Sequence, residues 1–207
     1  MRRTVVLCYH MVSATYEHRL SISPQLLLRQ VRLLTRFARV RASFDDAFRS
    51  AAAVFPALER RGVPVQIFVC TGYARDGSPL TIPEFEGDDP EQLATMTWEE
   101  LRAHAERGVE IGSHGIAHAH LTRLSDADLH RELGESKAEI EDVLGRRCPD
   151  LAYPYGEHDE RVRAAARAAG YERAYGLRER GHDAYALRRV DLYRRHAPFG
   201  ALLRLYA

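Results

Sequence analysis

The sequence predicts an α/β protein in which helices surround a parallel sheet. Strand-like and helix-like segments alternate along the whole chain, as in proteins built from repeated β–α units. Residues 63–70 form a nearly continuous apolar run, which is typical of a strand buried on both faces. The length of 207 residues suits one substantial domain better than two. The alternation alone fits either an open doubly wound sheet or a closed barrel.

Seven segments have strand character because they are short and rich in apolar, β-branched or aromatic residues. They are residues 4–10, 40–44, 63–70, 109–114, 151–156, 171–176 and 186–193. Helices are expected between them, and several carry start or stop signals. Ser23-Pro24 and Thr97 begin two of them, and Gly62, Gly108 and Gly145 end three. Residues 73–95 show no periodicity and are expected to form a long loop near the site.

Composition excludes several classes of function. The formal net charge is only +1, which argues against binding to nucleic acid or to anionic lipid. The three cysteines have no CxxC spacing, so neither a disulfide framework nor a thiolate metal site is expected. No run is long enough for an integral membrane segment, and the apolar run after Met1 is shorter than an export signal. We therefore expect a cytoplasmic protein; the sequence leaves its oligomeric state open.

Ionisable or turn residues follow four of the predicted strands. They are His10, the pair Asp45-Asp46, His114 with His118, and the YPYG turn at 153–156. Strand carboxyl ends meet at one rim of a parallel sheet or barrel, so these groups are expected to converge. Two imidazoles and one carboxylate suit Zn²⁺ or a related divalent metal with an open position for water. The second aspartate would then accept a proton from that water.

Each of these features also has a simpler explanation. Paired aspartates are common in turns and helix caps. HGIAHAH, with His120 beside the pair, fits a histidine-rich surface turn, and His10 alone fits a half-buried histidine. The joint occurrence of the features at strand ends favours a site.

The same segments resemble the polysaccharide deacetylases (carbohydrate esterase family 4). ASFDDAFR resembles their first motif, usually TFDDG, and SHGIAH resembles the second, a His-x3-His preceded by serine. LAYPYG resembles the third motif, and VPVQIFV resembles the strand usually written ATFFV. The resemblance extends from about residue 4 to residue 193. It implies a distorted (β/α)7 barrel, with residues 1–207 forming a single catalytic domain.

The resemblance also implies roles for individual residues. Asp45 would be the general base, and Asp46, His114 and His118 would hold the metal. The main-chain N–H of Tyr155 would stabilise the oxyanion. Zn²⁺ is the first expectation for the cofactor, with Co²⁺, Fe²⁺ and Ni²⁺ as alternatives.

Three positions depart from the family pattern. Ala47 replaces the glycine after the paired acids, which predicts a slightly different turn. Ala152 stands where an arginine often steadies the base, and Arg188 or Arg189 is the candidate substitute. The late motif with an acid histidine has no clean match at His196. CYHMVS resembles the start of a subgroup of the family in which this early strand supplies the acid, so we favour His10 over His196 as the general acid.

The implied activity is metal-dependent removal of an N-acetyl group from an amino sugar or an acetylated glycan or glycoside. The enzyme would cleave a carbon–nitrogen amide bond in an acetylated carbohydrate. The same site would also suit an O-acetyl ester or a non-sugar amide. From another class, a non-catalytic carbohydrate-binding relic of the fold is the alternative.

Overall fold

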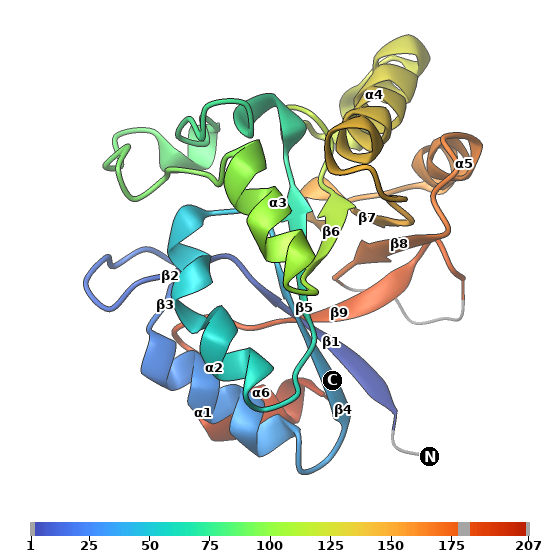
Figure 1. Cartoon of the computed structure of the whole chain (residues 1–207). Helices are drawn as coiled ribbons and strands as arrows, with labels where there is room; N and C mark the ends of the chain where they lie inside the picture. The colour runs from blue at the N-terminus through green and yellow to red at the C-terminus, as the bar shows by residue number, and fades with distance from the viewer. Residues whose placement is uncertain (1–2, 178–182, 206–207) are drawn as a thin grey trace.

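The computed structural model describes residues 3–177 and 183–205, which form a closed barrel of seven parallel strands with helices outside it (Figure 1). In barrel order the strands are β1 (Thr4–Tyr9), β4 (Arg39–Phe44), β5 (Val65–Val69), β6 (Glu110–Ser113), β7 (Asp150–Ala152), β8 (Arg173–Gly176) and β9 (Leu187–Asp191). β1 pairs with both β4 and β9, and this pairing closes the barrel. The (β/α)7 barrel is therefore confirmed, and an open sheet is excluded.

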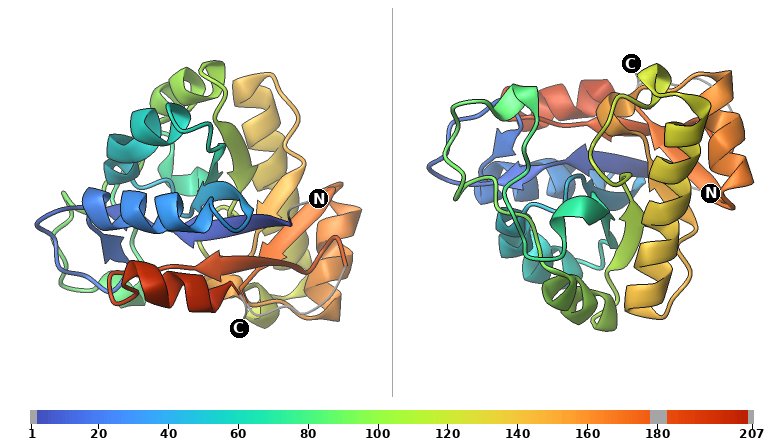
Figure 2. Two further views of the ribbon diagram at one scale, coloured as in Figure 1. Left: turned by 90° about the horizontal axis from the view of Figure 1, so that it is seen from below. Right: turned by 90° about the horizontal axis from the view of Figure 1, so that it is seen from above.

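Six α-helices surround the barrel in the described residues (Figure 2). They are α1 (Pro24–Leu34), α2 (Phe55–Glu59), α3 (Trp98–Glu106), α4 (Asp126–Leu144), α5 (Glu160–Ala168) and α6 (Pro198–Arg204). The Ser23 side chain caps α1, Thr97 and Glu100 form a capping box on α3, and Gly145 ends α4 at φ 62°. The sequence did not reveal α6, which packs against α1. Among the described residues, no helix has the length and apolar character needed to cross a bilayer.

Two segments after strands differ from the expected regular elements. A 3₁₀ helix, Arg49–Val54, precedes α2 where the sequence suggested one continuous helix. The strand expected over 151–156 ends at Ala152, and Pro154–Gly156 form another 3₁₀ turn, because Pro154 has no N–H to continue the ladder. The chain after β1 also contains a short parallel pair, β2 (Met11–Val12) with β3 (Ser21–Ile22).

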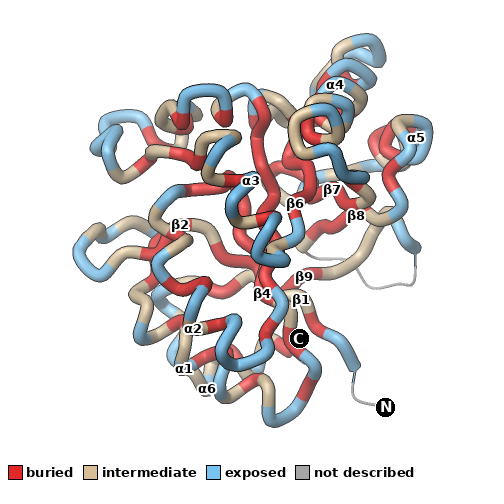
Figure 3. Tube along the Cα trace, viewed as in Figure 1, coloured by how far each residue is buried: buried red, intermediate tan, exposed pale blue. Residues whose placement is uncertain are grey.

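Burial is concentrated on the barrel strands, and the outer faces of the helices are exposed (Figure 3). All five residues of β5 are buried, as expected for a strand covered on both faces. The core joins the strand residues that face the helices to the inner faces of those helices in one large cluster. This packed frame fixes the positions of the loops at the carboxyl ends of the strands.

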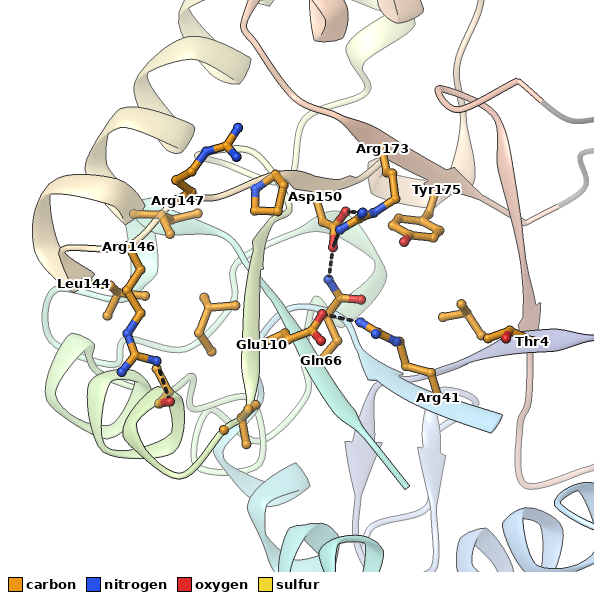
Figure 4. A pocket seen from close by; sticks show the side chains of 17 residues that line it. Thr4, Arg41, Gln66, Glu110, Leu144, Arg146, Arg147, Asp150, Arg173 and Tyr175 are labelled. Carbon is orange, nitrogen blue, oxygen red and sulfur yellow. Dashed lines mark hydrogen bonds and ion pairs between the residues drawn. The ribbon is translucent and has the colours of Figure 1, made fainter. Parts of the chain in front are cut away.

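The amino end of the barrel contains a cavity of about 570 Å³ (Figure 4). Its polar groups are mostly paired with one another: Gln66 donates to Asp150 at 2.7 Å, and Arg173 binds both oxygens of the same carboxylate. Arg41 and Glu110 form a second ion pair there. No imidazole lines this cavity. The candidate catalytic residues lie in a different, smaller cavity.

A close approach at Gly112 provides a test of this packing. A Cβ atom at Gly112 would lie 2.6 Å from the Phe68 ring and 2.9 Å from the carbonyl oxygen of Asp150. We expect Gly112→Ala to lower the free energy of unfolding by about 1–3 kcal/mol. Gly134→Ala, inside α4 with nothing within 4 Å of the new atom, should instead raise it by up to about 1 kcal/mol. Urea unfolding of both variants measures the contrast, and equal effects would contradict the packing described.

Candidate active site

A cavity of about 430 Å³ contains the residues that the sequence singled out. Its lining includes His10, Asp45, Asp46, His114, His118 and Tyr155. Ligand atoms of Asp46, His114 and His118 all lie within 4.8 Å of one another. Residues from several strand ends are thus brought together, as the convergence argument required.

The two aspartates face one cavity because the backbone turns sharply after β4. The Asp45 N–H donates to the carbonyl of Tyr9 at 2.9 Å, extending the ladder with β1. Asp46 and Ala47 then adopt left-handed backbone at φ 65° and φ 53°. Ala47 therefore takes a conformation that glycine favours, at a cost of about 1 kcal/mol.

Arg189 on β9 is the buried partner of Asp45. Its two terminal nitrogens lie 2.5 and 2.8 Å from the two oxygens of Asp45, and its side chain is fully buried. Arg188 instead donates to the carbonyl of Arg204, which resolves the choice between the two arginines. Burial alone would raise the pKa of Asp45, but the guanidinium, aided by His114, holds it well below its usual range. Asp45 is therefore an ionised hydrogen-bond acceptor at neutral pH.

His114 is held in one tautomer at the end of β6. Its Nδ1 lies 2.7 Å from the carbonyl oxygen of Ala152, which can only accept, so Nδ1 carries the hydrogen. The lone pair of Nε2 then faces the cavity, 3.6 Å from an Asp46 oxygen. This arrangement, with the outer nitrogen bonded to a carbonyl, is typical of metal-binding histidines.

The histidines of the HGIAHAH segment lie in two different environments. His118, at φ 56°, places its Nε2 3.3 Å from the same Asp46 oxygen that His114 faces. His120 points elsewhere: it contacts Glu157 at 3.0 Å and stacks on the ring of Tyr155. The description as a surface histidine turn therefore fits only His120.

Glu132 on α4 holds this segment in place, and the sequence analysis did not identify it. One of its oxygens accepts the N–H groups of Ile116 and Ala117 at 2.8 and 2.7 Å. The side chain is buried on the same helix face as Leu129 and Leu133. A glutamate on an apolar helix face is the signal that could have revealed it.

The charges at Asp46 fit a divalent cation. Burial lowers the pKa of His114 to about 3 and that of His118 to about 4, so both imidazoles are neutral. The lone pair of His114 Nε2 therefore faces a carboxylate oxygen of Asp46, an arrangement that repels unless a cation or a proton lies between them, and His118 Nε2 faces the same oxygen. Burial also raises the pKa of Asp46 to about 7 in the absence of such a cation. The donor set of one carboxylate oxygen and two imidazole nitrogens matches the preference of Zn²⁺.

A second group, Cys8, His10 and Asp45, is also close enough to share an ion. Arg189 already binds both oxygens of Asp45, and the Cys8 thiol lies 3.4 Å from one of them. Burial raises the pKa of Cys8 well above its usual value, so the thiol keeps its proton. This group therefore suits a metal less well than the Asp46 group.

The two candidate acid histidines occupy different environments. His10 lines the cavity, and its buried Nδ1 has no hydrogen-bond partner in the described structure. His196 does not line the cavity; its Nδ1 accepts the N–H of Tyr193 at 3.0 Å, and its carbonyl accepts from Gln30. The geometry favours His10, because only His10 can face a substrate bound beside Asp46.

Family membership is shown by a comparison with known protein families, independently of the site's geometry. Residues 35–174, more than half of the chain, match the model of the polysaccharide deacetylase family. The chain belongs to the polysaccharide deacetylase family. YxkH of Bacillus subtilis (strain 168), named as a polysaccharide deacetylase, is 25% identical over 153 residues. That match covers 72% of this chain and 49% of YxkH, so the chain spans about half the length of this relative.

Solved deacetylase structures share the fold. The Streptococcus pyogenes deacetylase PplD, in complex with acetate, has a TM-score of 0.81 at 17% identity, covering 98% of this chain and 97% of PplD. IcaB from Ammonifex degensii has a TM-score of 0.78 at 22% identity, covering 99% and 97%. A family 4 carbohydrate esterase from Streptomyces lividans, also with acetate, has a TM-score of 0.51 at 21% identity, covering 66% and 60%. The resemblance to carbohydrate esterase family 4 is confirmed.

In this member of the family, the loop over 73–95 forms part of the cavity wall. Phe85 packs with Met11, Phe48, Leu80 and Leu93 in a small separate core that anchors the loop. The adjacent Glu84 lines the cavity, and the Tyr155 hydroxyl lies 3.5 Å from its carboxylate. Tyr155 itself has φ 61°, so its backbone is fixed in a sparsely populated conformation beside the cavity.

The Arg189–Asp45 pair should dominate local stability. We expect Arg189→Met to lower the free energy of unfolding at pH 7 by about 3–5 kcal/mol, because it leaves a buried carboxylate without its partner. Since the pKa of folded Asp45 is depressed, the pair stabilises the fold above the unfolded pKa of about 3.9 and loses this effect at lower pH. The difference from wild type should therefore shrink below about pH 4. Urea unfolding across pH measures this, with Arg188→Met as the control; similar losses in both variants would contradict it.

Glu132 should also be needed for folding of the histidine segment. Glu132→Ala removes the two hydrogen bonds that the N–H groups of Ile116 and Ala117 donate to its carboxylate, for an expected loss of about 3 kcal/mol. Glu135→Ala, on the exposed face of the same helix, is the matched control and should change stability by less than about 0.5 kcal/mol. Denaturant unfolding of the two variants distinguishes them, and equal stability would show that Glu132 does not hold the segment.

Proposed function

We propose that the protein is a metal-dependent hydrolase that removes an N-acetyl group from an amino sugar or an acetylated glycan. The observation that supports this most directly is the meeting of Asp46, His114 and His118 around one point, with Asp45 held ionised beside them. Family membership supports deacetylation of a glycan. The amide bond and the metal are the parts that the proposal adds.

Asp46, His114 and His118 would hold the cation. When bound, a divalent metal such as Zn²⁺ supplies a Lewis acid that polarises the acetyl carbonyl and lowers the pKa of a water molecule. The other metals that suit this donor set are Co²⁺, Fe²⁺ and Ni²⁺. The Ala152 carbonyl keeps His114 in the tautomer that this binding requires.

Asp45 would orient the attacking water and accept its proton. Arg189 binds both Asp45 oxygens in the plane of the guanidinium, which fixes the carboxylate and leaves its remaining lone pairs for the water. The main-chain N–H of Tyr155 would donate to the oxygen that becomes negative. Losing one such donor typically costs about 3 kcal/mol of transition-state stabilisation.

His10 would donate a proton to the departing amine. An amine is too basic to leave without a proton, whereas an alcohol leaves more readily, so an acid beside the scissile bond favours amide over ester hydrolysis. A carbohydrate-binding relic would have no need of a carboxylate held ionised in the cavity. Both points support an amide hydrolase over the alternatives.

Metal removal should abolish the activity. We expect acetate release from N-acetylated sugars to disappear after chelation and to return on addition of Zn²⁺ or Co²⁺. Asp46→Ala should lose both bound zinc and turnover. Asp45→Asn should retain zinc, measured by metal analysis, and lose at least about a hundredfold in kcat. Activity that survives chelation and Asp46→Ala alike would refute the proposal.

A further inference from the structure

Two arginines at the edge of the catalytic cavity lack a carboxylate partner. Arg19 lies between β2 and β3, Arg195 follows β9, and both line the cavity. Neither lies within 4.0 Å of a carboxylate oxygen in the part of the chain that the structure describes. Two positive charges from separate segments therefore meet at the site without internal neutralisation.

The acidic residues near these two arginines already have other partners. Glu17 pairs with Arg194 at 2.7 Å, and Asp191 pairs with Arg204. Besides Asp45 and Asp46, the acids that line the cavity are this Asp191 and Glu84, whose carboxylate lies 3.5 Å from the Tyr155 hydroxyl. The charges of Arg19 and Arg195 are thus available to a ligand.

Arg19 and Arg195 lie where the catalytic cavity meets a second groove. A groove of about 470 Å³ adjoins the catalytic cavity, and the two share Arg19, Tyr193 and Arg195. The Arg195 guanidinium lies 4.8 Å from the centre of the Tyr193 ring, which also has the rings of His196 and His10 as neighbours. A substrate that extends from the metal centre into the groove would pass Arg19 and Arg195, because both residues line both hollows.

We propose that the substrate is an acetylated amino sugar carrying an anionic group, a phosphate or a carboxylate, which Arg19 and Arg195 bind. Guanidinium groups match both anions with paired, charge-assisted hydrogen bonds. Tyr193 provides an aromatic surface for the sugar beside them. This inference rests on the proposed deacetylase function and adds the chemistry of the substrate to it.

The test compares acetate release by the zinc-loaded, full-length protein from matched sugars. N-acetylglucosamine, its 1-phosphate, its 6-phosphate and its 6-carboxylate differ only in the anion and its position. We expect kcat/KM for at least one anionic sugar to exceed that for the neutral sugar by at least about tenfold. The Arg19→Gln/Arg195→Gln double variant should reduce this ratio at least tenfold. Arg36→Gln, an exposed arginine after α1, removes the same kind of charge elsewhere and should leave the ratio unchanged.

The outcomes separate the two proposals. Acetate release from all four sugars at similar kcat/KM would overturn the anion inference and leave the deacetylase intact. A preference that persists in the double variant would also overturn it. If no sugar is deacetylated, the proposed function fails, and calorimetric binding of glucosamine 6-phosphate against glucosamine decides the anion site. Tighter binding of the phosphate that is lost in the double variant supports the site; equal binding refutes it.

Discussion

Two carboxylates are buried side by side at the carboxyl end of the barrel, and each needs a positive charge. Arg189 supplies one to Asp45, with both oxygens bound and no exposure to solvent. Asp46 instead faces the Nε2 atoms of two neutral imidazoles, which carry no positive charge to neutralise it. A cation bound at that point would supply the missing charge, as a metal does in other carboxylate–histidine sites. The organisation of the whole rim follows from this division of charge.

At the carboxyl end of the barrel, the backbone is strained in the turns that direct side chains into the cavity. The non-glycine residues with positive φ in the described structure are Asp46, Ala47, His118 and Tyr155, and all four belong to the turns around the site. Such conformations cost roughly 1–2 kcal/mol each and persist only where the surroundings enforce them. The buried strands below these turns hold the strained conformations in place. Side chains such as Glu132 on α4 also hold them, since Glu132 binds the backbone of the histidine segment. Strain at this rim is offset by packing in the frame.

The sequence predicted what depends on local pattern. Alternating strands and helices, cap signals and polar residues at strand ends predicted an α/β parallel sheet with those residues at one rim. The family resemblance added the barrel and the choice of Asp46, His114 and His118 as one cluster. The sequence left open what depends on contacts between distant residues: Arg189 reaches Asp45 across 144 positions, and neighbouring Arg188 has the same chemistry. Likewise, His120 and His118 differ only in which way the loop turns, and Glu132 acts through a fold-dependent contact with the loop. The roles of the site residues in catalysis remain predictions.

Ala152 and Arg189 lie close to the same part of the barrel interior, and Arg189 supplies the charge that Asp45 needs. Ala152 is fully buried and packs with Phe68 and Tyr175 inside the barrel. The Arg189 guanidinium lies 5.1 Å over the Phe68 ring, so it occupies interior space that a long side chain at position 152 would also need. The small residue on β7 and the large one on β9 are therefore complementary in volume. In a close-packed interior, the small side chain of Ala152 on β7 leaves room for the guanidinium that binds Asp45 from β9.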